Sequence, residues 1–152
     1  MSGVAARLEE LGLTIPEVVP PVAAYVPANR TGNLVYTAGQ LPMRDGSLIA
    51  TGKVGGEVTA EEATECARQC AINALAAVQS LVPLDQVVKV VKAVVFVAST
   101  PDFTGQPGVA NGASNLFGDV FGDAGKHARS AVGVPVLPLD APVEVELIVE
   151  VA

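Results

Sequence analysis

The chain has 152 residues, which is the usual size of one domain, so we expect a single domain over residues 1–152 that begins with an extension over 1–20. Half of the residues are hydrophobic, 16% are charged and the mean hydropathy is +0.45, which excludes a disordered chain. Sixteen acidic side chains against 9 basic ones give a net charge of -7. Nucleic acid is therefore not an expected partner, because phosphate binding requires clustered cations.

No segment predicts export or membrane insertion. The first eleven residues include an arginine and two glutamates, where a secretory signal requires an unbroken apolar run. The most apolar segment, residues 87–98, is interrupted by two lysines and is too short to cross a bilayer. We therefore expect a soluble cytoplasmic protein that has no membrane partner.

The first third of the chain predicts a short helix, an extended segment and a hairpin. Residues 4–11 form an amphipathic run that ends at Gly12, and prolines between Pro16 and Pro27 then favour extended backbone. A strand is predicted over 34–39, and Asp45-Gly46 is typical of a hairpin turn. The glycine-rich segment 52–56 is interpreted as a flexible loop; the alternative, a phosphate loop, fits poorly because no helix follows it directly.

The clearest predicted helix covers residues 60–81. Thr59 and Glu62 have the spacing of a capping box, and Pro83 ends the pattern. Its predicted buried stripe consists mostly of small residues: Ala63, Cys66, Cys70, Ala74, Val78 and Leu81.

The two cysteines of this helix, Cys66 and Cys70, are interpreted as small apolar core residues. A disulfide framework needs more cysteines. A metal site would need further Cys or His ligands, and the spacing is not that of a thioredoxin-type pair. We therefore expect no metal and no other cofactor.

The second half of the chain predicts a strand over 87–97, a helix over 107–121, a loop over 122–126 and an extended segment over 129–136. The last strand, 143–151, alternates, with Val143, Val145, Leu147, Val149 and Val151 on one side. This order predicts an α+β fold, a mixed sheet with two main helices on one face. The uncovered face would expose an apolar surface, so we expect a homo-oligomer.

Three polar residues near the end of the chain are candidates for chemistry. Arg129 opens an apolar strand, where an arginine needs either an acidic partner or a ligand, and its planar fork suits a carboxylate. Glu144 is either a solvated carboxylate of the last strand or a catalytic one. His127, the single histidine, is interpreted as a loop residue, with a cleft acid as the alternative.

Five groups of residues together resemble the Rid family, also called the YjgF family, of reactive intermediate deaminases. The resemblance runs from about Pro21 to the C-terminus and depends on the spacing between these groups as well as on the residues. The first group consists of Tyr25 and, fourteen residues later, Gly39 within Thr37-Ala38-Gly39-Gln40-Leu41-Pro42. The other four are Val94-Val95-Phe96-Val97, Arg129-Ser130, Leu137-Pro138 and Val143-Glu144-Val145-Glu146.

The resemblance implies a chorismate-mutase-like fold, a trimer with sites between subunits, and hydrolysis of enamines and imines such as 2-aminoacrylate to 2-keto acids and ammonia. In the family pattern Arg129 holds the substrate carboxylate and Glu144 positions the attacking water. The remaining positions that match residues lining the cleft are Tyr25, Gly39, Ala131 and Asn111.

The sequence departs from the family pattern at several points. Ala131 stands where a cysteine is common, and Ala38 stands where a serine is usual. His127, the 122–126 loop and the N-terminal helix are additions, which is consistent with a divergent branch. Two alternatives therefore stay open: a regulatory trimer that binds carboxylate ligands without turnover, and an endoribonuclease-like activity.

Overall fold

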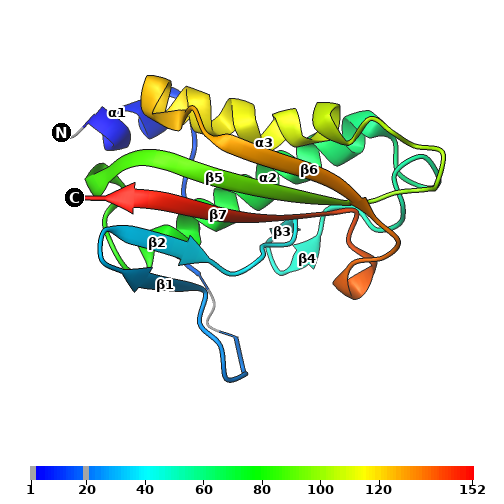
Figure 1. Ribbon diagram of the computed structural model, residues 1–152, viewed down its shortest axis with the longest axis horizontal. Helices are drawn as coiled ribbons and strands as arrows, with labels where there is room; N and C mark the ends of the chain where they lie inside the picture. Colours follow the sequence, from blue (N-terminus) through cyan, green and yellow to red (C-terminus); the bar gives the residue numbers. More distant parts are fainter. Residues whose placement is uncertain (1–2, 19–20) are drawn as a thin grey trace.

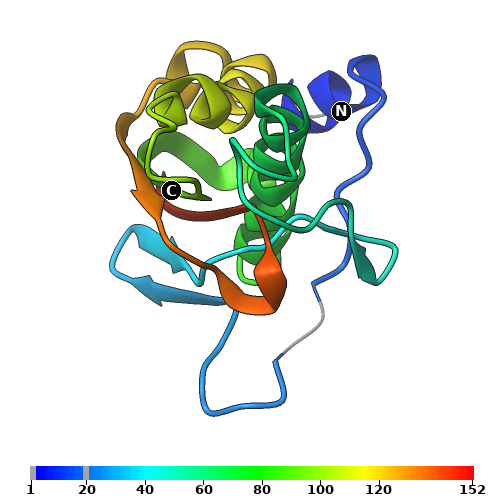
Figure 2. The same cartoon turned by 90° about the vertical axis from the view of Figure 1, so that its right-hand side faces the viewer.

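The computed structural model describes residues 3–18 and 21–152, and it has the expected α+β architecture. Helices α2 (Ala60–Gln79) and α3 (Gln106–Phe121) cover one face of a five-stranded mixed sheet (Figures 1 and 2). The strand order is β1-β2-β7-β5-β6. The strands are β1 (Ala28–Thr31), β2 (Leu34–Thr37), β5 (Val87–Ala98), β6 (Ala128–Val134) and β7 (Val143–Val151).

The only parallel pair among the named strands is β5 with β6, and α3 forms the crossover between them. Such a crossover places its helix on a face of the sheet, here over β5 and β6. Helix α2 packs instead on β2 and β7. The other face of the sheet has no helix over it in the described ranges (Figure 2).

The predicted capping box begins α2. The Glu62 amide donates to Thr59 Oγ1 at 3.1 Å, and the Thr59 amide donates to Glu62 Oε1 at 3.3 Å. The predicted end at Leu81 is wrong, because α2 stops at Gln79. The amides of Leu81 and Val82 both bond to the Val78 carbonyl, which tightens the last turn. This turn moves Leu81 out of the predicted stripe and leaves it 46% exposed.

The alternation predicted for the last strand is confirmed in β7. Its apolar side chains on the helix-covered face are at most 1% exposed, and its glutamates occupy the opposite face half-buried. Strand β7 lies inside the sheet, between β2 and β5, so Glu144 does not lie on an edge strand.

Elsewhere the expected elements differ in their ends. Strand β2 ends at Thr37 rather than residue 39; the Ala38 amide still bonds to the Pro27 carbonyl, and Gln40 then bonds to Val145 of β7. The predicted hairpin is confirmed as β3 (Met43–Arg44) and β4 (Ser47–Leu48), with φ positive at both turn residues. The expected loop over 122–126 is instead a 3-10 turn over Gly122–Gly125.

The N-terminal helix α1 (Gly3–Glu10) contributes no fully buried side chain. It is tied to the end of α3 because Arg7 Nε donates to the Asp119 carbonyl at 2.7 Å. Of the helices in the part of the chain that the structure describes, none is long and apolar enough to cross a membrane.

Candidate functional site

Arg129 lies at the start of β6 and its side chain turns toward α3. Its register partner on β5 is Ala93, which is buried under the helices. Directly paired residues of a sheet point to the same face, so Arg129 is on the helix-covered side. Its Nη1 donates to Asn111 Oδ1 at 2.9 Å and to Ser114 Oγ at 3.2 Å. Both acceptors belong to α3, which therefore fixes one nitrogen of the guanidinium.

Apart from the two bonds of Nη1, the Arg129 guanidinium has no partner among the described residues. Within residues 3–18 and 21–152, no carboxylate forms an ion pair with it, and Nε and Nη2 make no hydrogen bond. The acidic partner that the sequence left open is therefore not found in the described chain. Nε and Nη2 form one edge of the planar fork, and this edge matches the two oxygens of a carboxylate.

His127 lies in the connection just before β6 and contacts the same helix. Its Nε2 is 2.9 Å from Ser114 Oγ, and its Nδ1 is 2.6 Å from the Gly125 carbonyl. The ring also packs edge-on against Phe117, with centroids 5.6 Å apart and an interplanar angle of 88°. Ser114 thus joins His127 to Arg129, a connection that was not predicted from the sequence.

Glu144 lies on the other face of the sheet. Its register partner on β5 is Phe96, three residues beyond Ala93, and successive residues of a strand alternate between faces. Burial raises the pKa of the Glu144 carboxyl, and the negative charge of Glu146 raises it further. A carboxyl group of this kind can exchange protons nearer to neutral pH than an exposed glutamate does.

Gly39 packs directly against the Glu144 carboxylate. A Cβ atom at this position would overlap Glu144 Oε1, so only glycine leaves the carboxylate where it is. The next residue, Gln40, exchanges two backbone hydrogen bonds with Val145, at 2.8 and 3.0 Å. The loop after β2 is therefore attached to β7 beside Glu144.

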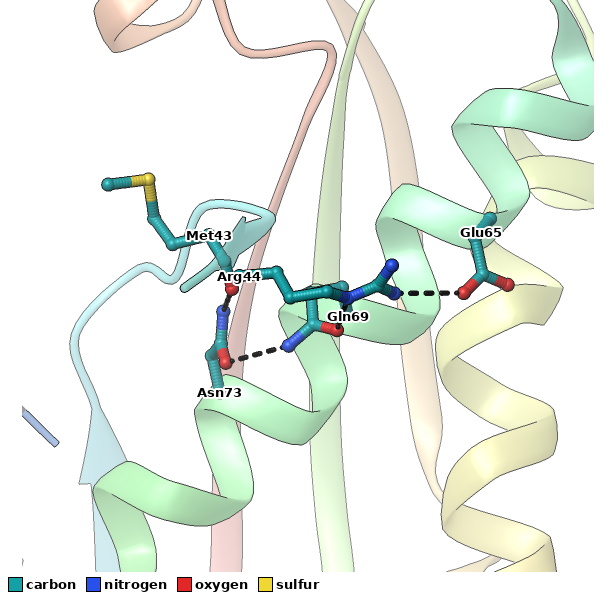
Figure 3. A network of polar contacts seen from close by, with 5 residues as sticks. All are labelled: Met43, Arg44, Glu65, Gln69 and Asn73. Carbon is teal, nitrogen blue, oxygen red and sulfur yellow. Dashed lines mark hydrogen bonds and ion pairs between the residues drawn. The ribbon is translucent and has the colours of Figure 1, made fainter. Parts of the chain in front are cut away.

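A polar network anchors the far end of this loop to α2 (Figure 3). Asn73 Nδ2 donates to the carbonyls of Leu41, at 2.9 Å, and of Met43, at 3.0 Å. This role was not predicted from the sequence, although a polar residue on a mostly apolar helix was a signal for it. The network continues along α2 through hydrogen bonds of 3.0 to 3.2 Å that join Asn73, Gln69, Arg44 and Glu65.

The structure places the two other predicted site residues as follows. Tyr25 is 60% exposed in the segment before β1, and this segment meets the glycine loop where Ala38 bonds to Pro27. Ala131 follows Arg129 by two residues on β6 and is partly buried against the core. One copy of the chain therefore gathers two separate groups. The arginine group contains Arg129, Asn111, Ser114 and His127, and the glutamate group contains Gly39 and Glu144.

The remaining candidates of the sequence analysis take structural roles. Cys66 and Cys70 are buried, and burial raises the pKa of the Cys66 thiol to about 11 and that of Cys70 well above its usual range. In the glycine-rich loop the Lys53 amide donates to Glu57 Oε2 at 3.1 Å, so a carboxylate of the chain occupies it. No group of three metal-ligating side chains forms within the described residues.

Fold and site together define a small α+β protein with a guanidinium that no acidic side chain of the described residues neutralises. Residues 15–151 match the family model described as endoribonuclease L-PSP. The chain therefore belongs to this family, and the resemblance of its motifs to the YjgF family is confirmed at this level.

Three relatives illustrate the range of similarity. The chain is 45% identical over 149 residues to the Trypanosoma cruzi protein TCP17, covering 97% of this chain and 93% of that protein. The structure of Atu1372 from Agrobacterium tumefaciens, a protein of unknown function, is 45% identical, with a TM-score of 0.89 over 98% of this chain and 93% of that one. The YjgF gene product of E. coli is 28% identical, with a TM-score of 0.65, and the match covers 86% of this chain and 91% of that one.

Proposed function

We propose that the protein hydrolyses 2-imino and 2-enamino acids, such as 2-aminoacrylate and 2-iminobutanoate, to 2-keto acids and ammonia. The observation that carries the proposal is the state of Arg129. Its Nη1 is held by two neutral acceptors, and its Nε–Nη2 edge has no partner in the described chain. An arginine held in this way is prepared for a bidentate bond to the carboxylate of a small acid.

The proposed site forms between copies of the chain. Arg129 and Glu144 lie on opposite faces of one sheet, so a small ligand cannot contact both within one copy. The sheet face without helices presents Tyr36, 43% exposed, and Val132, 42% exposed, and such apolar groups favour association. In the proposed trimer one copy supplies the arginine group, and its neighbour supplies the glutamate group together with Tyr25.

The proposed reaction needs only orientation and one proton-transfer group. The carboxylate of the substrate binds Arg129, which places the electrophilic C=N carbon near Glu144 of the neighbouring copy. The imine reacts in its protonated, iminium form: Glu144 accepts a proton from water as the water oxygen bonds to this carbon and the C=N electron pair moves to nitrogen, giving a neutral carbinolamine. Glu144 then gives this proton to the nitrogen, the C–N bond breaks as the hydroxyl oxygen forms the C=O bond, and Glu144 accepts the hydroxyl proton as ammonia leaves. An enamine reaches the same path after it tautomerises to the imine.

The experiment is a trapping assay. A pyridoxal-phosphate-dependent dehydratase acting on threonine or serine generates the imine, and semicarbazide traps whatever imine has not been hydrolysed. We expect the wild-type protein to lower the trapping rate, and Arg129→Ala to restore the rate measured without the protein. Arg129→Lys is the matched variant, since it keeps the charge and removes the fork, and we expect it to behave like Arg129→Ala. An unchanged trapping rate with the wild-type protein would overturn the proposal.

The same protein samples decide between the alternatives. Binding of 2-keto acids without any effect on trapping would support a regulatory carboxylate-binding trimer. The family description names an endoribonuclease, but a net charge of -7 does not favour RNA binding. RNA cleavage that is lost in Arg129→Ala would support that activity.

One solved structure with the same fold holds a small amino acid. It is the E. coli protein TdcF with bound serine, which has a TM-score of 0.65 to this chain at 23% identity.

A further inference from the structure

We propose that His127 is a positioning residue that fixes the orientation of the Arg129 guanidinium through Ser114. The path is a chain of hydrogen bonds from Arg129 Nη1 to Ser114 Oγ, from there to His127 Nε2, and from His127 Nδ1 to the Gly125 carbonyl. We call this chain the arginine relay. It deepens the proposed function, on which it rests, by adding two residues that set how the carboxylate is held.

The direction of each hydrogen bond in the relay follows from its last member. A backbone carbonyl can only accept, so the His127 Nδ1 that lies 2.6 Å from the Gly125 oxygen carries a proton. In the neutral imidazole Nε2 is then an acceptor. It receives the hydroxyl proton of Ser114, whose oxygen lies 2.9 Å away.

This direction makes Ser114 an acceptor for Arg129. A serine has one hydroxyl proton, and pointing it at His127 leaves the oxygen lone pairs for Nη1. Without the imidazole acceptor the hydroxyl of a helical serine turns to the carbonyl one turn earlier in its own helix. The lone pairs then no longer point at Nη1, so His127 controls how Ser114 meets Arg129.

The relay is held rigidly at its far end. The His127 ring packs edge-on against Phe117, which is fully buried in α3. Gly125 is buried against the same helix, where a Cβ atom would overlap the Phe117 carbonyl oxygen. The Gly125 carbonyl therefore has a fixed position, and it orients the imidazole.

The consequence for the ligand is preorganisation of the free guanidinium edge. Asn111 and Ser114 bind the same Nη1 from two positions on α3, which sets the plane of the fork. The edge formed by Nε and Nη2 then keeps one direction before the ligand arrives. Fixing a binding group in advance increases affinity because less conformational entropy is lost on binding.

The test compares matched variants of the full chain by two readouts. His127→Phe keeps a ring against Phe117 but removes both nitrogens, whereas His127→Gln keeps an acceptor at the Nε2 position. The first readout is the NMR signal of the Arg129 guanidinium, recorded without any ligand and assigned by its loss in Arg129→Lys. This signal shows whether the guanidinium rotates slowly, as a fixed group does. We expect slow rotation in the wild type and in His127→Gln, and fast rotation in His127→Phe and Ser114→Ala.

The second readout is calorimetric binding of 2-oxobutanoate, with its uncharged amide as the control ligand. We expect His127→Phe and Ser114→Ala each to weaken binding of the acid about tenfold relative to the wild type. His127→Gln should bind the acid within about threefold of the wild-type affinity. Binding of the amide should change less than about twofold. The double variant should bind the acid no more weakly than Ser114→Ala, because both residues act through one path.

Two results would overturn the relay. One is a guanidinium that rotates equally slowly in His127→Phe and in the wild type. The other is equal weakening of acid and amide, which indicates a general structural defect. Failure of the proposed function is distinguishable, because the trapping assay would then be negative while the ligand-free NMR comparison still decides on the relay.

Discussion

Arg129 and Glu144 lie on opposite faces of the same sheet. Their register partners on β5 are Ala93 and Phe96, which are three positions apart, and an odd offset along a strand reverses the side on which a side chain points. A guanidinium that suits a carboxylate and a carboxyl group that suits proton transfer are therefore separated within each copy. The chain carries two incomplete groups, and the proposed activity depends on a neighbour that completes each one.

The contact between Gly39 and Glu144 gives the first test of the glutamate group. In Gly39→Ala the new Cβ overlaps Glu144 Oε1, and the flexible end of the glutamate can move away more easily than the backbone. We expect turnover in the trapping assay to fall about 100-fold, because the carboxyl group leaves its position. The unfolding midpoint should change little. Gly108→Ala is the control, since nothing lies within 4 Å of a Cβ there.

The raised pKa of Glu144 predicts the pH dependence of turnover. The proposed base acts in its ionised form, so the rate should rise with pH through the pKa of Glu144 and then level off. The midpoint of this rise should lie above the ordinary range of glutamate. Glu144→Gln should lower turnover by roughly 10² to 10⁴-fold and abolish the rise, with 2-oxobutanoate binding nearly unchanged. A profile that is flat down to pH 4 in the wild type would contradict this assignment.

The same shift predicts a stability difference of known sign. A carboxyl group whose pKa is raised by folding destabilises the folded state when it is ionised. This destabilisation is absent at pH values below the unfolded pKa, and it grows as the pH rises toward the folded pKa. Glu144→Gln should therefore be more stable than the wild type near neutral pH, with a difference that shrinks as the pH is lowered. Urea unfolding at a series of pH values measures it.

Local spacing in the sequence was sufficient to predict the main elements. The Thr59–Glu62 capping box and the alternation over 143–151 depend on contacts three and two residues apart, and the structure has both. Leu81 was assigned wrongly because helical spacing continued past the point where the hydrogen bonding changes. The last turn of α2 tightens after Val78, which the apolar pattern does not record.

The arrangement of the site could be predicted only in part. Arg129 and Glu144 were proposed as site residues from their residue types and from the family motifs, but their opposite faces follow from the register of β5 with β6 and β7. The contact of Ser114 with His127 depends on how the 3-10 turn packs on α3. Neither relationship is encoded by spacing along the chain, since both depend on tertiary structure.

The crossing of α2 and α3 gives a test of the fold. A Cβ at Gly112 would overlap the Thr64 carbonyl oxygen, and a backbone atom of a packed helix cannot move aside without separating the helices. We expect Gly112→Ala to lower the free energy of unfolding by roughly 1–3 kcal/mol. Gly118→Ala in the same helix has open space and should stabilise the protein by about 0.5–1 kcal/mol. Equal stability of the two variants in urea would contradict the close crossing.

The sheet face without helices provides the test of assembly. Val132 lies on this face, in register with Phe96 and, across β5, with Glu144. It is 42% exposed in one copy, so a glutamate there would be tolerated by a monomer. At a buried interface the same charge would have no partner and would oppose association. We expect Val132→Glu to convert a trimer into monomers in light scattering after size-exclusion chromatography, and to abolish turnover in the trapping assay.

Leu81→Glu is the matched control for this change. Leu81 is 46% exposed at the end of α2, so the substitution adds the same charge at similar exposure, away from the sheet face. We expect it to leave both the assembly and turnover unchanged. A Val132→Glu protein that stays trimeric and active would show that this face is not the interface. A wild-type monomer that turns over imines would contradict the shared site itself, because Arg129 and Glu144 of one copy cannot meet on a small ligand.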